Sequence, residues 1–187
     1  MSGLMVVFPK GYADVVAKLR VPSGFLIVLV FAVFSHPTPH SLAWGLPISL
    51  LGLGLRAWAA GSLAKNRQLA TGGPYAYARN PLYLGTLLVA AGLVVASRSI
   101  GLGILFGAVF LFVYLPVIQL EEQHLRRLFP EYAAYADQVP ALFPRLTPFP
   151  QKNSNPFRVS LYLINKEYQA GVGFITGMLF LAWKMLG

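Results

Sequence analysis

The sequence predicts an all-helical (all-α) polytopic membrane protein, with about five membrane-spanning helices and one amphipathic helix at the cytoplasmic interface. Composition is the first reason. The 187 residues are 56% hydrophobic and only 11% charged, whereas soluble domains carry about 25% charged residues. The second reason is a series of apolar runs, which approach the roughly 20 residues that a helix needs to cross a bilayer. No linker divides the chain into two cores, so we expect a single membrane domain over residues 1–187.

The positions of the apolar runs give the expected spans: residues 21–35, 41–63, 81–97, 100–120 and 169–186. The first is the shortest, and the fourth contains Pro116, which predicts a bend. Only residues 97–99 separate the third span from the fourth, so these two must form an antiparallel hairpin. In the fifth span, Gly171, Gly173 and Gly177 would permit close contact with another helix.

The first span has an alternative interpretation as a signal peptide, because Lys10, Lys18 and Arg20 precede the apolar run of residues 25–34. That run leads into a stretch rich in proline and histidine, without a clear small-residue cleavage site. We therefore expect an uncleaved first membrane helix.

The distribution of positive charge predicts the orientation of the chain. With the N-terminus in the cytoplasm, twelve Lys and Arg residues lie on the cytoplasmic side and only Arg98 and Lys184 on the far side, where the C-terminus lies. All six acidic residues are then cytoplasmic as well. The net charge of +9 therefore reflects topology and contact with anionic membrane lipids, which makes nucleic acid a poor candidate partner.

The absence of cysteine excludes disulfides, thiolate catalysis and Cys-based metal sites. His36 and His40 lie in a proline-broken loop, so no metal site is expected there. After the fourth span, Leu125, Leu128 and Phe129 recur at helical spacing, which predicts the amphipathic interfacial helix, restarted at Pro130. The prolines between residues 140 and 150 then predict an extended chain.

A polar island at residues 72–85 separates the second span from the third. Arg79, Asn80 and Pro81 begin the third span, and Asn followed by Pro is a favourable helix start. One interpretation is that these residues only start the helix. The other is that the free amides of the helix start, beside an arginine, bind an anionic group such as a carboxylate.

Glu121 and Glu122 end the fourth span. They either lie on a solvated helix face, paired with Arg126 or Arg127, or one of them holds a cationic ligand group. Adjacent helical residues point about 100° apart, so only one should face a ligand, and Glu122 is the favoured candidate. We expect the glutamates and the polar island to meet in space and form a cofactor site. Arg56, inside the second span, either extends to the interface or lines this polar cavity.

A set of ordered motifs resembles a known family. These are Arg56-Ala57-Trp58, residues 73–85, Glu121-Glu122, residues 128–135, Val139-Pro140 and Phe143-Pro144. Together they look like the isoprenylcysteine carboxyl methyltransferase and phospholipid N-methyltransferase family of integral membrane enzymes. The family-like core covers about residues 50–146, and a tail helix at about residues 157–187 lies outside it.

The resemblance implies a small helical enzyme that binds S-adenosylmethionine from the cytosolic side. The residues that it assigns to the cofactor are Arg79, Asn80, Pro81, Tyr83, Gly85, Glu121 and Glu122. Among these, Glu122, Arg79 and Glu121 are the catalytic candidates, and Arg56, Tyr132 and Arg145 are candidates on the acceptor side. Tyr75 is a further cofactor-binding candidate, as an interfacial aromatic that could pack on a ligand ring. The family's histidine is Asn80 here, which excludes proton transfer by a base at this position. Residues 115–120 contain no arginine, which argues against a prenylcysteine carboxylate as acceptor.

The predicted function is therefore methyl transfer from S-adenosylmethionine to a lipid or another lipophilic acceptor in the membrane, by O- or N-methylation. Two alternatives remain: a sterol-type membrane reductase that uses NADPH, and a non-enzymatic transporter or scaffold. The absence of paired repeats argues against a transporter. The acceptor and the oligomeric state stay open.

Overall fold

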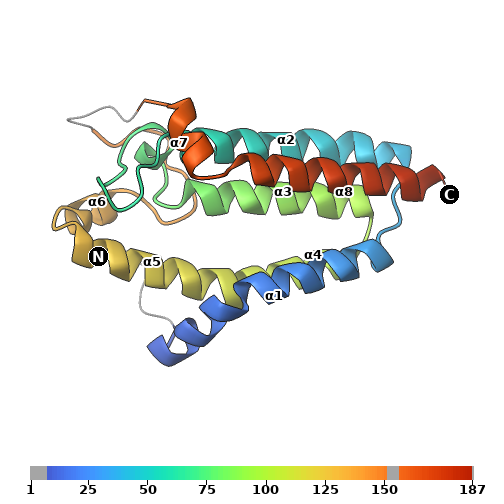
Figure 1. The fold of residues 1–187 in the computed structure, drawn as a ribbon, viewed down its shortest axis with the longest axis horizontal. Coiled ribbons are helices and arrows are strands. Elements are labelled where there is room, and N and C mark those ends of the chain that lie inside the picture. The colour runs from blue at the N-terminus through green and yellow to red at the C-terminus, as the bar shows by residue number, and fades with distance from the viewer. Residues whose placement is uncertain (1–7, 151–155, 187) are drawn as a thin grey trace.

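The computed structural model describes residues 8–150 and 156–186. Its elements are α1 (Lys10–Phe34), α2 (Pro39–Gly61), η1 (Gly73–Ala76), α3 (Pro81–Ser97), α4 (Ile100–Val109), η2 (Phe110–Tyr114), α5 (Leu115–Leu128), α6 (Tyr132–Gln138), α7 (Val159–Ile164) and α8 (Tyr168–Leu186). Figure 1 shows α2, α3 and α8 along one side of the molecule and α1, α4 and α5 along the other. The short helices α6 and α7 gather with the long connections at one end. The all-helical class is confirmed for the residues described.

Helix α1 begins earlier than predicted, at Lys10 rather than at residue 21. It is bent by 55° between the half-helices Lys10–Leu19 and Pro22–Phe34. Pro22 explains the bend, because proline removes a backbone N–H and its ring crowds the preceding turn. The first half-helix contacts the π-helical turn η2, because the Tyr12 hydroxyl donates to the Phe112 carbonyl at 2.7 Å. That carbonyl lies four residues before Pro116, where an α-helix would need the N–H that proline lacks.

The predicted fourth span and the start of the predicted interfacial helix form one continuous helical rod. It runs through α4, the π-helical turn η2 and α5, over Ile100–Leu128. The π-helical turn ends two residues before Pro116, so the predicted irregularity is present as a π insertion. Glu121 and Glu122 therefore lie inside a helix, not at its end as predicted. The chain breaks at Phe129 and restarts in α6 after Pro130, as expected.

Helices α2 and α3 are in closest contact through glycines. A Cβ on Gly45 would lie 2.4 Å from the Gly92 carbonyl oxygen, and one on Gly52 would lie 2.7 Å from that of Gly85. Small residues allow such backbone contact between membrane helices. The glycines of α8 were expected to permit a similar close contact. A Cβ on Gly171, Gly173 or Gly177 would meet nothing within 4 Å among the described residues, so these glycines form no such contact there.

Within the described part of the chain, three helical rods are long and apolar enough to cross a membrane: α2, Ile100–Leu128 and α8. The bent pair that makes up α1 raises the number to four, and α3, with 17 residues, is shorter. The predicted count of about five is thus three to four by length and composition, although all five predicted segments are helical. The hairpin of α3 and α4 is confirmed, with Arg98 in the left-handed conformation at its turn. At the same end, the Lys184 amine donates to the carbonyls of Ala32 (2.7 Å) and Val33 (2.9 Å), and so joins α8 to the end of α1.

Candidate active site

The polar island is held in place by the proline-rich segment that follows α6. The backbone amides of Arg79 and Asn80 donate to the carbonyls of Pro140 (2.9 Å) and Ala141 (3.1 Å). Farther along, Arg145 donates its amide to Tyr77 (3.0 Å). These bonds satisfy backbone groups that would otherwise be buried without partners. They also fix the backbone position from which the Arg79 side chain extends.

Arg79 and Glu122 form a buried ion pair that joins the polar island to α5. Nε of Arg79 donates to one carboxylate oxygen of Glu122 at 2.9 Å, and Nη2 donates to the other at 3.1 Å. Asn80 donates its amide to the same carboxylate at 3.1 Å. Arg79 and Glu122 are only 5% and 4% exposed, so the pair is screened from water. The predicted meeting of the two clusters is therefore confirmed.

The guanidinium of Arg79 also caps the C-terminus of helix α6. Nη1 of Arg79 donates to the carbonyls of Ala136 (2.6 Å) and Val139 (2.9 Å). Carbonyls at a helix C-terminus lack intrahelical partners, so Arg79 both neutralises Glu122 and satisfies these acceptors. All three nitrogens of its side chain are engaged by described residues.

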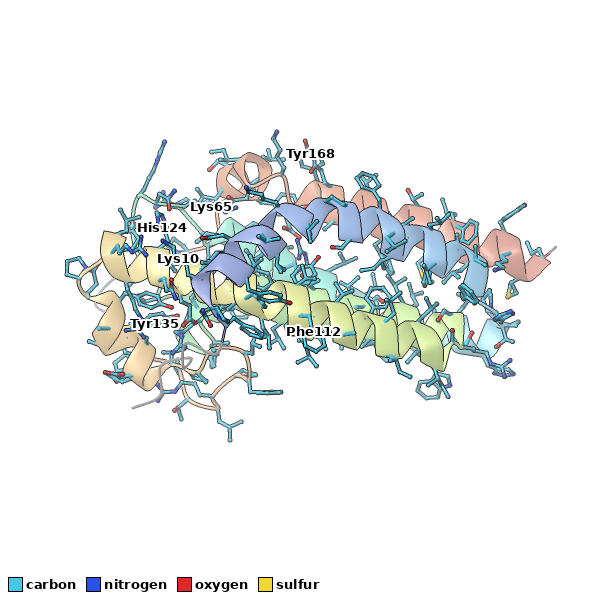
Figure 2. The ribbon with its side chains drawn as sticks, turned by 90° about the horizontal axis from the view of Figure 1, so that it is seen from below. Lys10, Lys65, Phe112, His124, Tyr135 and Tyr168 are labelled. Atoms are coloured by element: carbon cyan, nitrogen blue, oxygen red, sulfur yellow. The ribbon has the colours of Figure 1, made fainter. Side chains whose placement is uncertain are left out.

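A cavity of about 600 Å³ lies beside this pair, lined by residues of α2, α3, α5, α6 and the segment before α8. Glu121 lines the cavity and accepts a hydrogen bond from the Tyr83 hydroxyl at 2.8 Å. Glu122 is not among the described residues that line it. The two adjacent glutamates thus differ in their surroundings. Glu121 faces the cavity, whereas Glu122 is buried outside the lining and paired with Arg79. Figure 2 shows His124 and Lys65, two further lining residues, at the end of the molecule where Tyr135 lies.

A second ion pair lies in the cavity wall. Arg56 of α2 donates through Nε and Nη2 to the two carboxylate oxygens of Glu167, at 2.6 and 3.0 Å. Its Nη1 donates to the Thr86 hydroxyl of α3. Gly85 makes room for this side chain, because a Cβ there would lie 2.5 Å from Cγ of Arg56. Arg56 therefore lines the cavity, and its partner is the glutamate of the tail rather than the pair on α5.

Two tyrosine hydroxyls at the cavity have no hydrogen-bond partner among the described residues, those of Tyr75 and Tyr132. Burial, then the charges of Glu121 and Glu167, raises the pKa of Tyr75 above its usual range. Burial and the Glu122 charge do the same for the pKa of Tyr132. Both groups are thus held in the neutral form, in which a hydroxyl can donate and accept. Buried polar atoms rarely lack partners, so these two suit a polar ligand.

The structure brings most of the sequence-predicted site residues to this cavity. Its walls include Arg56, Tyr75, Arg79, Asn80, Pro81, Tyr83, Glu121 and Tyr132. Gly85 and Arg145 lie outside the described lining: Gly85 is a packing position under Arg56, and Arg145 is partly exposed and donates to the Gln138 carbonyl at 3.1 Å. The sequence reasoning did not single out Thr86, His124, Asn165 or Glu167, which also line the cavity. Glu167, the one acid at the start of the last span, was the available signal.

These helices define a class of protein: an integral membrane protein with a polar cavity at one end of its helical rods. Comparison with known proteins identifies the family within that class. The profile of the phospholipid methyltransferase family matches residues 44–132, and a curated relative of the chain is 35% identical over 68% of that relative's length. The chain belongs to the phospholipid methyltransferase family, which confirms the resemblance in its motifs. No solved structure was found to match it.

Two curated relatives carry names from metal resistance. The first is the cobalt-zinc-cadmium resistance protein CzcN of Cupriavidus metallidurans, whose 35% identity extends over 74% of this chain. The second is the nickel-cobalt-cadmium resistance protein NccN of Alcaligenes xylosoxydans xylosoxydans, 36% identical over 56% of this chain. The match spans about half of that second relative, 52% of its length. Within residues 8–150 and 156–186, no group of three or more His, Cys, Asp or Glu side chains is placed to hold a metal ion.

Proposed function

We propose that the protein is an S-adenosylmethionine-dependent methyltransferase that acts on a lipid or another lipophilic acceptor at the cytosolic face of the membrane. The observation that carries this proposal is the cavity of about 600 Å³ beside the Arg79–Glu122 pair. It falls within the roughly 300–1,000 Å³ that ligand pockets occupy. The orientation, with the cavity and the N-terminus in the cytosol, rests on the charge bias of the loops.

The residues around the cavity fit the chemistry of this cofactor. It carries a sulfonium and an ammonium group, and the carboxylate of Glu121 lies in the cavity wall. It also carries hydroxyl and amino groups, and the hydroxyls of Tyr75 and Tyr132 have no partner among the described residues. The three guanidinium nitrogens of Arg79 are already engaged, so its proposed role is to place Glu122, Asn80 and the cavity wall. Lys65, which lines the cavity and is exposed, is the better candidate for the cofactor's carboxylate.

When bound, the cofactor supplies an activated methyl group, so the protein's tasks are binding, orientation and electrostatic stabilisation. An acceptor carboxylate needs no base. An acceptor amine must lose a proton, and Glu121 is the candidate that faces the cavity, since Glu122 is held by Arg79. Asn80 donates to Glu122 and to the Ala141 carbonyl, which makes it a positioning group in this scheme.

The experiment is calorimetric titration of S-adenosylhomocysteine into detergent-purified protein, with Glu121→Gln as the test variant. We expect wild-type protein to bind, and the variant to bind about tenfold more weakly or worse, because one charge-assisted contact is lost. Glu131→Gln is the matched control, since Glu131 is exposed and precedes α6. Failure of correctly folded wild-type protein to bind the nucleoside would reject the proposed function, and equal affinities of the two variants would reject the role of Glu121.

A further inference from the structure

The segment that precedes α8 closes one side of the cavity, although it lies outside the region that matches the family. This tail strap, residues 156–168, contains α7 and is attached to the C-terminal end of α2. The Arg158 amide donates to the Gly61 carbonyl at 2.8 Å, and the Asn165 side chain donates to the carbonyls of Ala60 and Leu63, both at 2.9 Å. The Ala60 and Gly61 carbonyls belong to the last turn of α2, where intrahelical donors run out, and Leu63 lies just beyond it. The strap therefore serves as the cap of α2.

A specific turn directs the strap back toward the cavity. After α7, the Lys166 amide donates to the Leu163 carbonyl (3.0 Å) and the Glu167 amide to the Tyr162 carbonyl (3.2 Å). This is the hydrogen-bond pattern of a Schellman motif. Lys166 takes the left-handed position with φ of 54°, which glycine usually occupies because other residues are strained there. The strained turn places Asn165 and Glu167 on the same cavity wall.

Glu167 is buried in an ion pair, although other contacts already attach the strap to α2. Glu167 is only 8% exposed, and it forms a two-point contact with Arg56. Burying an ion pair costs desolvation energy that its attraction need not return, and the contacts of Arg158 and Asn165 already attach the strap. An ionisable pair within a membrane protein usually marks a functional site.

The contacts of Arg56 fix its guanidinium in a single plane. Four of its five N–H groups donate to described residues: two to Glu167, one to Thr86 and one to the Leu82 carbonyl. The group therefore lies between α2, α3 and the strap, with its side chain in the cavity wall. Without Glu167, two of these four contacts disappear, and only Nη1 keeps its hydrogen bonds, to Thr86 and to the Leu82 carbonyl.

We propose that Glu167 is a positioning residue of the cavity: it orients Arg56 so that the guanidinium contacts the bound nucleoside cofactor. The tail strap is then part of the site, and the site is incomplete in residues 44–132 alone. This inference rests on the proposed function. Glu167, Glu121 and Tyr75 all line the same cavity.

The test is a double-mutant cycle read by two measurements, the affinity for S-adenosylhomocysteine and the thermal midpoint in detergent. The variants are Glu167→Gln, Arg56→Gln and the pair together, with Glu131→Gln as an exposed control. Glu167→Gln should weaken binding about tenfold, the value of one oriented charge-assisted hydrogen bond. In the Arg56→Gln background, the same change should have no further effect on affinity, because Glu167 acts through Arg56.

A purely structural ion pair would behave differently. The double variant contains no unmatched charge, so its thermal midpoint should recover relative to Glu167→Gln. If the affinity recovers with it, Glu167 only stabilises the fold and the positioning role is overturned. Unchanged affinity in Glu167→Gln would overturn it as well, while the proposed function would stand. Absence of binding by the wild-type protein would reject the proposed function and this inference together.

Discussion

Replacing Glu122 by glutamine is expected to destabilise the protein by about 3–5 kcal/mol, the usual cost of leaving one partner of a buried ion pair without the other. For a chain of this size, that corresponds to a thermal midpoint lower by roughly 10 °C. The change preserves shape and removes only the charge. Arg79, which is 5% exposed, would keep the two α6 carbonyls but lose its counter-charge, and the amide of the new side chain would face its N–H groups.

The neighbouring substitution is the control. Glu121→Gln makes the same chemical change one residue earlier on the same helix, but Glu121 is exposed at the cavity, and the Tyr83 hydroxyl is its hydrogen-bond donor. We expect its thermal midpoint to stay near that of the wild-type protein, with reduced nucleoside affinity. Differential scanning fluorimetry in a single detergent compares the two variants. Equal midpoints would contradict the separation of a structural Glu122 from a cavity-facing Glu121.

The sequence was sufficient to predict that the polar island and the paired glutamates meet. Both clusters are rare polar features at the ends of apolar spans, and membrane proteins seldom carry charge without a partner. The ion pair of Arg79 and Glu122 confirms this expectation. The α3 boundaries, Pro81–Ser97, also agree with the prediction, because Asn80-Pro81 and Arg98 mark both ends clearly.

Which glutamate faces the cavity could not be predicted. The π-helical turn at Phe110–Tyr114 adds a residue to the helical repeat, and it changes the direction of every side chain after it by about 100°. Periodicity counted along residues 100–128 therefore assigns the wrong face beyond this turn. Glu167 was missed for another reason: its partner, Arg56, lies 111 residues away, and no local pattern links them.

Gly52→Ala is expected to separate α2 from α3 and to destabilise the protein by about 1–3 kcal/mol, as overpacking of tight interiors does. A Cβ at this position would lie 2.7 Å from the Gly85 carbonyl oxygen and 2.7 Å from the Val89 amide nitrogen. Both are backbone atoms, so no side chain can turn aside, and one helix must shift. The result would be a lower thermal midpoint in detergent, although alanine favours a helix by up to about 1 kcal/mol over glycine.

Gly54→Ala, two residues later on the same helix, isolates the effect of the contact. Gly54 is exposed and would place its Cβ where nothing lies within 4 Å, so only the gain in helix propensity remains. The two variants should therefore shift the midpoint in opposite directions. Because Arg56 lies one turn from Gly52 and contacts Thr86 across the same interface, Gly52→Ala should also weaken nucleoside binding, and Gly54→Ala should not. Matching midpoints and affinities in the two variants would show that glycine contact between α2 and α3 does not set the geometry of the cavity.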